Sequence, residues 1–175
     1  EDVEVIAIGK RPGKDPAAYW RVWRTLRRLR PAIVHTRNLG TVDMQWVAAA
    51  AGVRHRVHGE HGWEASDPKG LSPRSLRIRR GCRPVIHRYV PMSQDIARWL
   101  EQSVGVAPSR IRQLYSGVDS QKFRPTPDPS PMQVSAGSDE RMLTLGTVGR
   151  LDPVKNQAAL LEAFAKLSAA SPATP

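Results

Sequence analysis

Short apolar runs alternate with amphipathic segments along most of this 175-residue chain. The runs expected to form strands are Val3–Ile8, Ala32–Thr36, Val53–His58, Pro84–Val90, Ile111–Tyr115 and Met142–Val148. The segments expected to form helices are Pro16–Arg30, Val42–Ala51, Pro73–Arg80, Gln94–Ser103 and Asn156–Ala169. This alternation is typical of βαβ units, so the sequence predicts an α/β protein with a parallel sheet flanked by helices.

The first helical segment contains five arginines and two tryptophans. Pro16 suits a first helical turn, and Pro31 ends the helix before the next strand. One face groups Tyr19, Trp23, Leu26 and Leu29, and another groups Arg21, Arg24 and Arg28. Because the apolar residues share a face, we expect the tryptophans to be packing groups rather than platforms on which bases stack.

Residues 124–141 interrupt the alternation with prolines at 125, 127, 129 and 131, followed by Ser-Ala-Gly-Ser. This composition predicts a linker that is partly extended and partly flexible. We therefore expect one domain at 1–123 and the start of a second at 142–175. The first residues read as a strand already under way, and the last predicted helix ends close to residue 175. We expect truncation at both ends.

The formal net charge of +11 and the pI near 10.8 favour an anionic partner. Most of the basic residues are arginine, which suits bidentate contact with phosphate or carboxylate. A nucleotide, a nucleic acid or an acidic membrane surface would fit, and a merely solvated basic surface is the alternative. The densest basic run spans residues 74–83; it suits a helix lying on an anionic membrane or, our preferred interpretation, a solvated helix face.

The chain has one cysteine, Cys82, which excludes a disulfide within the chain and is typical of a reducing compartment. We expect a structural thiol rather than a nucleophile. No run approaches the roughly 20 apolar residues of a membrane span. A cytoplasmic location follows as an expectation, with peripheral contact with the inner face of the membrane as the further possibility.

Polar or small residues follow each predicted strand after the first. In a parallel sheet the carboxyl ends of the strands share one edge, and ligands bind there. Ser93 also suits the N-cap of the next helix. The residues expected along this edge are His35, Thr36, Arg37 and Asn38; Gly59, Glu60, His61, Gly62 and Trp63; Ser93; Ser116, Gly117, Val118 and Asp119; and Gly149 and Arg150.

Gly149, Arg150 and Lys155 lie where the last predicted strand leads into a helix, and a helix N-terminus favours anions. Two fixed cations there would stabilise the negative charge that develops on a diphosphate leaving group. Each charge-assisted hydrogen bond would contribute about 1.5–3 kcal/mol. The alternative is a pair of surface cations, a location that the helix dipole slightly disfavours.

The histidines between residues 55 and 61 do not predict a metal site. His55 and His58 are three apart on a strand and point to opposite faces. No fourth ligand stands at a recognised spacing. His61 lies between Gly59 and Gly62, which allow close backbone approach to a ligand. It is either a functional residue or a hydrogen-bonded loop histidine.

Several motifs in this order resemble those of the retaining glycosyltransferases of family four, which have the GT-B architecture of two Rossmann-like domains facing across a cleft. The motifs are RPAIVH at 30–35, VPMS at 90–93, SGVDSQKF at 116–123, VGRLDPVKN at 148–156 and LLEAF at 160–164. The resemblance implies that residues 1–123 are the later part of the N-terminal, acceptor-side domain. Residues 142–175 would then be the first βα unit of the C-terminal domain that binds the nucleotide sugar.

The resemblance implies transfer of a sugar from a nucleotide diphosphate donor, with retention of configuration and without a metal or other cofactor. Gly149, Arg150 and Lys155 would hold the donor diphosphate, and His61 would be the catalytic residue facing the transferred sugar. The acceptor would be a saccharide or lipid-linked, and no nucleic acid is expected. Residues expected to contact the acceptor or line the cleft are His35, Glu60, Trp63, Ser93, Ser116, Gly117 and Asp119. The GEHGW motif at 59–63 is also similar to sugar transferases of bacterial exopolysaccharide systems.

The sequence departs from the family pattern in three places. Ser116 stands where an asparagine is usual, and neither the paired glutamates nor the glycine-rich loop of the family occurs, so we expect the chain to be inactive alone. Two other classes stay open. A basic nucleic-acid-binding module lacks any recognised binding signature here. Another Rossmann-type sugar nucleotide enzyme, such as an epimerase, would carry a Gly-x-Gly-x-x-Gly fingerprint that is absent.

Overall fold

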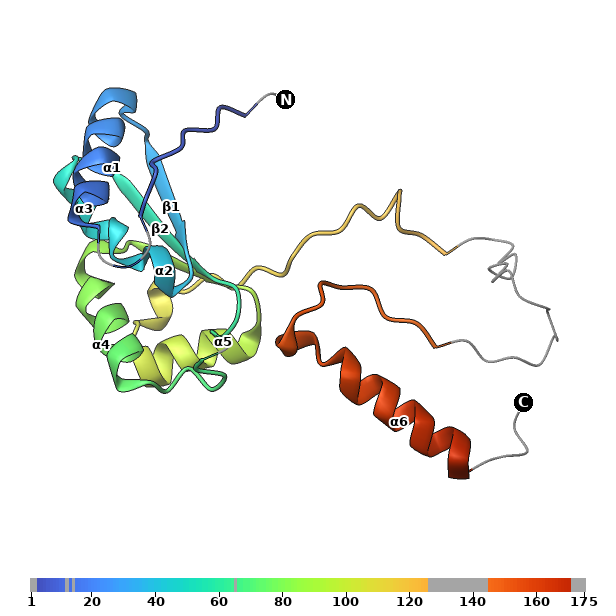
Figure 1. Ribbon diagram of the computed structural model, residues 1–175. Helices are drawn as coiled ribbons and strands as arrows, with labels where there is room; N and C mark the ends of the chain where they lie inside the picture. Colours follow the sequence, from blue (N-terminus) through green and yellow to red (C-terminus); the bar gives the residue numbers. More distant parts are fainter. Residues whose placement is uncertain (1–2, 12, 14, 65, 126–144, 171–175) are drawn as a thin grey trace. The chain divides into compact units, whose positions relative to one another are not determined.

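The computed structural model describes residues 3–11, 13, 15–64, 66–125 and 145–170. The chain divides into two compact units, Glu1–Gly117 and Val118–Pro175 (Figure 1). Of the predicted linker, residues 124–125 are exposed and belong to no helix or strand, and residues 126–141 lie outside the described residues.

The first unit contains a three-stranded parallel sheet in the order β1-β2-β3. The strands are β1 (Ile33–Arg37), β2 (His55–Glu60) and β3 (Arg88–Pro91). Three of the six predicted strands are thereby confirmed, each shifted by one to four residues at its ends. β2 extends past Gly59 because the sheet register pairs Glu60 with Pro91 of β3. The predicted α/β class with a parallel sheet is therefore confirmed.

A fourth extended segment runs beside β3 without forming a full strand. Ile111 makes an isolated parallel bridge with Tyr89. The backbone N–H of Arg112 donates to the Tyr89 carbonyl at 2.9 Å, and that of Leu114 donates to the Pro91 carbonyl at 3.1 Å. The strand predicted at 111–115 is thus present only as this partly paired edge.

Helices occupy most of the segments that connect the strands. They are α1 (Pro16–Leu29), α2 (Leu39–Val42), α3 (Met44–Ala50), α4 (Pro73–Cys82) and α5 (Gln94–Trp99), which continues into a π-helical turn, Leu100–Val104. Proline stands at the start of α1 and of α4, as expected for a first turn. The Ser93 hydroxyl accepts a hydrogen bond from the Ile96 N–H at 3.2 Å, so the predicted N-cap of α5 is confirmed.

Helices α1 to α5 pack against one face of the sheet, the face that carries Thr36, His58 and Tyr89 (Figure 1). We call it the covered face, and the opposite one the open face. The larger apolar cluster on the covered face joins Tyr89 to residues of α2, α4 and α5, and the smaller one joins α3 to Leu26 and Val34. On the open face of β1, the side chains of Ile33, His35 and Arg37 are exposed.

Two expectations for the N-terminal part are wrong. The predicted strand 3–8 does not form; Val3 and Val5 are exposed, because no neighbouring strand pairs with this segment among the described residues. The tryptophans of α1 are not buried packing groups, since Trp20 is 57% exposed and Trp23 is 38% exposed. Arginine side chains lie over both indoles, Arg24 over Trp20 and Arg27 over Trp23.

The second unit contains one helix, α6 (Gln157–Ala170), preceded by a 3₁₀ turn, Pro153–Lys155, within its described residues. The predicted helix is confirmed. The predicted strand 142–148 is not present at residues 145–148, because a strand needs a partner and none pairs with it among the described residues; residues 142–144 lie outside them.

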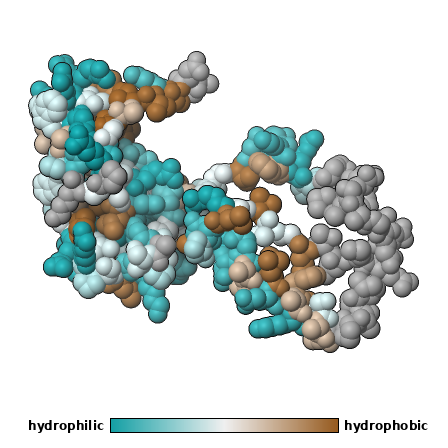
Figure 2. All heavy atoms as spheres, in the orientation of Figure 1, coloured by the Kyte–Doolittle hydropathy of each residue, from teal (hydrophilic) through white to brown (hydrophobic). Residues whose placement is uncertain are grey.

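No described residue between 118 and 125 or between 145 and 170 is buried. Apolar side chains of this unit lie at the surface, including Leu151, Leu161 and Phe164. Figure 2 shows brown, hydrophobic atoms at the surface of this unit. None of the helices in the described part of the chain has both the length and the apolar character that a membrane crossing requires.

Candidate functional site

The carboxyl end of β2 places consecutive side chains on opposite faces of the sheet. Side chains alternate along a strand. His58 and Glu60 therefore lie on the covered face, where both are buried, and His61 continues the open face. The sequence predicted a single set of site residues along this edge, whereas the structure separates them into two chemically different groups.

The open-face group brings together His35, Arg37 and His61. A Cβ placed on Gly59 would lie 2.8 Å from the Nε2 atom of His35 and 2.9 Å from that of His61. Both imidazoles therefore converge above Gly59, and only glycine leaves them this space. The Arg37 guanidinium lies along the edge of the His61 ring, with Nε 3.2 Å from Nε2 and Nη2 3.1 Å from Nδ1.

Asn38 fixes the backbone of this group. Its side-chain oxygen accepts from the His61 N–H at 2.9 Å, and its own N–H donates to the Gly59 carbonyl at 2.9 Å. Asn38 has a φ of 56°, in the left-handed region that a non-glycine residue rarely adopts. Strained backbone of this kind clusters at functional sites, where surrounding contacts hold it in place.

The electrostatics of the open-face group favour neutral imidazoles. Burial lowers the pKa of His61, and the nearby positive charge of Arg37 lowers it further. Burial also lowers the pKa of His35, with additional contributions from His58, His61 and Arg37. The two rings can therefore accept or donate a hydrogen bond at neutral pH, beside an exposed guanidinium that is permanently charged.

The covered-face group is a buried chain of hydrogen bonds that the sequence analysis did not find. The Gln45 amide donates to the Thr36 hydroxyl at 2.7 Å, and that hydroxyl lies 2.8 Å from His58 Nδ1. His58 Nε2 lies 3.1 Å from Glu60 Oε1. Because the Glu60 carboxylate can only accept, His58 Nε2 carries the proton of that bond.

Arg79 of α4 completes the covered-face group from the other side. Its Nε donates to Glu60 Oε1 at 2.7 Å and its Nη2 to Glu60 Oε2 at 3.2 Å. Nη2 also lies 3.2 Å from Glu64 Oε1. Burial alone would raise the pKa of Glu60, but the hydrogen bonds from His58 and Arg79 outweigh it and hold this pKa below its usual value. The two carboxylates likewise raise the pKa of Arg79 despite its burial.

Trp99 packs against Arg79, and Trp63 packs against Trp99. The Arg79 guanidinium lies 4.9 Å from the centre of the Trp99 ring, and the Trp63 and Trp99 rings pack edge to face at 4.9 Å. Trp99 Nε1 donates to the Gly70 carbonyl at 2.9 Å. Trp63, predicted to line a cleft, therefore packs against Trp99.

The basic run at 74–83 is a solvated helix face at Arg74, Arg77 and Arg80, as the preferred interpretation expected, but not at Arg79. Arg79 is only 1% exposed, so it belongs neither to a solvated face nor to a membrane-binding face. Arg80 and Arg83 donate to the carbonyls of Ser103 and Gly105. The buried residues of α4 are Ser75, Arg79 and Cys82, which share one face of the helix. The basic run by itself did not indicate which of its arginines would lie on that face.

The structure does not bring the remaining predicted residues of the first unit into the open-face group. Ser93 caps α5. Ser116 and Gly117 are exposed at the end of the unit. Asp119 belongs to the second unit, where its carboxylate accepts from the N–H groups of Gln121 and Lys122 and closes a turn.

The predicted donor-binding residues form a local turn in the second unit. The Lys155 side chain passes 3.7 Å from the Cβ position of Gly149, so these residues lie side by side. Arg150 is 85% exposed and lies 3.9 Å from the Asp152 carboxylate. Asp152 also accepts from the Val154 N–H at 3.0 Å and caps the turn. The turn leaves both cations accessible to a ligand.

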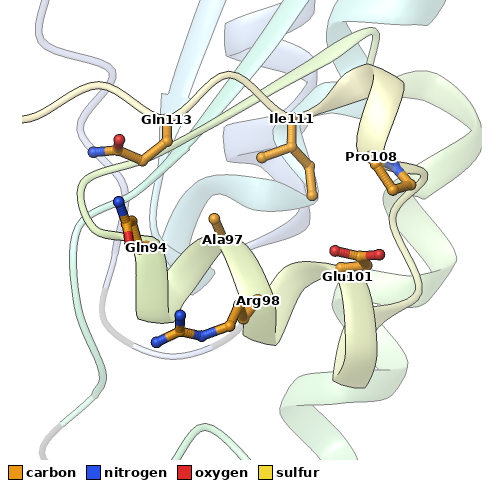
Figure 3. A pocket seen from close by; sticks show the side chains of 7 residues that line it. All are labelled: Gln94, Ala97, Arg98, Glu101, Pro108, Ile111 and Gln113. Atoms are coloured by element: carbon orange, nitrogen blue, oxygen red, sulfur yellow. The ribbon is translucent and has the colours of Figure 1, made fainter.

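A shallow groove of about 360 Å³ lies between α5 and the segment that follows it (Figure 3). Gln94, Arg98 and Glu101 line one side of the groove, and Pro108, Ile111 and Gln113 line the other. None of the residues predicted to act on a ligand contributes to this lining, so the groove is separate from the candidate site.

Comparison with known proteins identifies the family. The family model described as Glycosyltransferase Family 4 matches residues 2–122. The chain is also 27% identical over 151 residues to a D-inositol 3-phosphate glycosyltransferase of Rhodococcus erythropolis; the match covers 82% of this chain and 34% of that protein. The chain thus spans about a third of the length of this relative. On the match over its first unit, the chain belongs to Glycosyltransferase Family 4.

Proposed function

We propose that the protein containing this chain transfers a sugar from a nucleotide diphosphate donor to an acceptor, with retention of configuration. The observation that carries the proposal is the family match across the first unit, together with the histidine and arginine group at the carboxyl edge of its sheet. The match favours a transferase over a nucleic-acid-binding module or an epimerase. No metal or other cofactor takes part in this proposal.

The second unit would bind the donor. Arg150 and Lys155 would contact the diphosphate, and Gly149 would leave the backbone open to it. The attraction between the two cations and the diphosphate would strengthen as negative charge develops on the leaving phosphate. Stronger binding in the transition state than in the ground state is the condition for catalysis. The leaving phosphate would then help to deprotonate the acceptor hydroxyl.

The first unit would bind the acceptor and face the transferred sugar. His61 is the proposed catalytic residue, and its neutral ring can hydrogen-bond a sugar hydroxyl. The exposed guanidinium of Arg37 suits a phosphate group, so an acceptor that carries one fits the open-face group better than a neutral saccharide. Lipid-linked saccharides and sugar phosphates both meet this requirement. The relative's name, which specifies D-inositol 3-phosphate, is in line with it.

Substitution of the two donor cations tests the proposal. In the natural protein that contains this chain, Arg150→Ala and Lys155→Ala should each lower turnover roughly 10- to 150-fold, the loss of one charge-assisted hydrogen bond. Arg77→Ala is the matched control, because Arg77 is exposed on α4 and, in the part of the chain that the structure describes, bonds only Pro73 of its own helix. Unchanged turnover in both variants would remove the diphosphate assignment.

We further propose a cytoplasmic protein that works at an anionic membrane and takes part in exopolysaccharide synthesis. The α1 helix supports the membrane contact better than the run at 74–83, since Trp20 and Trp23 are exposed beside Arg24 and Arg27. Amphipathic helices with these residues bind membrane interfaces. Vesicles containing an anionic lipid should bind the chain, and Arg24→Glu with Arg27→Glu should weaken binding. Equal weakening by Arg74→Glu with Arg77→Glu would contradict the role of α1.

A further inference from the structure

We propose that Arg79 is a positioning residue for His61: by holding Glu60 and Glu64 together on the covered face, it fixes how the end of β2 presents the imidazole on the open face. The inference rests on the proposed function only for the role of His61 itself. The positioning by Arg79 stands on the geometry of residues 60–70.

First, the guanidinium of Arg79 bonds two carboxylates at once, those of Glu60 and Glu64. Two nitrogens of its guanidinium bond both oxygens of Glu60, at 2.7 and 3.2 Å, and Nη2 reaches Glu64 at 3.2 Å. Arg79 and Glu60 are each 1% exposed. A planar guanidinium can bridge two carboxylates in this way, whereas the ammonium of a lysine is a point charge without the fork. The segment between the two glutamates is therefore tied at both ends to one side chain of α4.

The second step is the alternation of β2. Glu60 and His61 are consecutive, so a side chain held on the covered face at 60 directs the next one to the open face. There the His61 N–H donates to Asn38, and its ring meets Arg37. Loss of the Arg79 contacts would leave the peptide between the two faces bonded, because the Met92 N–H donates to the Glu60 carbonyl at 3.1 Å. It would free the segment that follows His61, and the His61 ring would then leave its place above Gly59.

The third step is the anchoring of the rest of the loop. Trp99 lies beneath the Arg79 guanidinium and donates to the Gly70 carbonyl at 2.9 Å. The Asp67 carboxylate accepts from the N–H groups of Leu71 and Ser72, at the start of α4. Arg79 thus bonds residues 60 and 64, and Trp99 bonds residue 70, so Arg79 is the one of these two that holds the part nearest His61.

The experiment compares Arg79→Lys with the matched control Arg80→Lys. Arg80 stands next to Arg79 on the same helix, but among the described residues its guanidinium bonds only the Ser103 carbonyl. Two readouts in the folded chain report on position rather than on stability: hydrogen exchange of the amides at 61–64, and an NMR titration of the His61 ring. The ring is assigned from the signal lost in His61→Gln.

In Arg79→Lys we expect the hydrogen-exchange rates of the amides at 61–64 to rise at least about tenfold. A lysine cannot bond both carboxylates as the guanidinium does, so local opening of this segment costs less free energy. The pKa of His61 should move back towards its usual value as the ring leaves Arg37. In Arg80→Lys both readouts should stay as in the wild type. Lower stability with an unchanged His61 titration and unchanged exchange would overturn the inference, since that result describes a purely structural ion pair.

Glu64→Gln keeps the inference testable if Arg79→Lys does not fold. It removes one of the two carboxylates that Arg79 bonds and leaves the Glu60 pair in place. The same two readouts should change in the same direction, and no change would overturn the inference.

Turnover separates the two proposals. In the natural protein, Arg79→Lys should lower kcat roughly 10- to 100-fold, the cost of misplacing a catalytic group, with little change in the KM of the donor. If His61→Ala leaves turnover unchanged while Arg79→Lys alters exchange and titration, the proposed role of His61 fails and the positioning stands. If exchange and titration stay unchanged, the positioning fails whatever the turnover.

Discussion

The end of β2 and the turn at 149–156 both set charged side chains beside a glycine, yet their surroundings differ. At the end of β2, Glu60 and Arg79 are enclosed by α4, α5 and the sheet. At the turn, Arg150 and Lys155 are exposed, and the turn is closed mainly by Asp152. Packing therefore decides where the first group points, whereas local hydrogen bonds of the side chains of Asp152 and Gln157 shape the second. The comparison teaches that burial, more than charge density, marks the residues whose position is fixed.

The largest effect is expected from breaking the buried pair. Arg79→Met should lower the free energy of unfolding of the first unit by about 3–5 kcal/mol, because it leaves the buried Glu60 carboxylate without its cation. Lys155→Met in the exposed turn should change it by no more than about 0.5 kcal/mol. Urea unfolding followed by tryptophan fluorescence measures both. Similar losses in the two variants would erase the difference between the regions.

A smaller effect is expected from pH. The folded pKa of Glu60 lies below its usual value of 4.5, so the ionised carboxylate stabilises the fold fully above that pH. This contribution is lost as the pH falls from 4.5 through the folded pKa, because the unfolded chain then binds the proton more readily. Glu60→Gln should therefore flatten the fall in unfolding free energy below pH 4.5. A fall as steep as in the wild type would assign the acid sensitivity to other groups.

The smallest effect is expected at two capping residues. Ser93→Ala should cost about 1 kcal/mol in urea unfolding of the first unit, the usual loss of an N-cap on a packed helix. Asp152→Ala removes the corresponding bond to the Val154 N–H, but in a turn whose residues are not buried. Its effect on the same transition should lie within about 0.5 kcal/mol. A cost at Asp152 equal to that at Ser93 would show that the turn is packed in solution.

Local sequence signals predicted the fold of the first unit well where an element has its own start or stop residue. Pro16 begins α1, Pro73 begins α4 and Ser93 caps α5, each at its expected place. The strands at 3–8 and 142–148 were predicted from apolar character alone. A strand exists only with a partner, so apolar character could not decide whether either segment would pair.

The candidate site was predicted in part. Among the expected edge residues, His35, Arg37 and His61 lie together, although a role toward a ligand was expected only for the two histidines. Glu60 lies at the expected edge, but its carboxylate turns inward to His58 and Arg79. Arg79 pairs with a carboxylate that lies 19 residues away in the chain. A run of basic residues does not indicate which of its arginines will form such a buried pair.

Residues close together in the chain set the order of the family motifs, the alternation of β1 to β3 with helices, and the starts of α1, α4 and α5. The tertiary structure alone decided which side chains at the end of β2 are buried and which are presented. That choice depends on α4 and α5 covering one face of the sheet, so that Glu60 meets Arg79 there and His61 meets Arg37 on the other face.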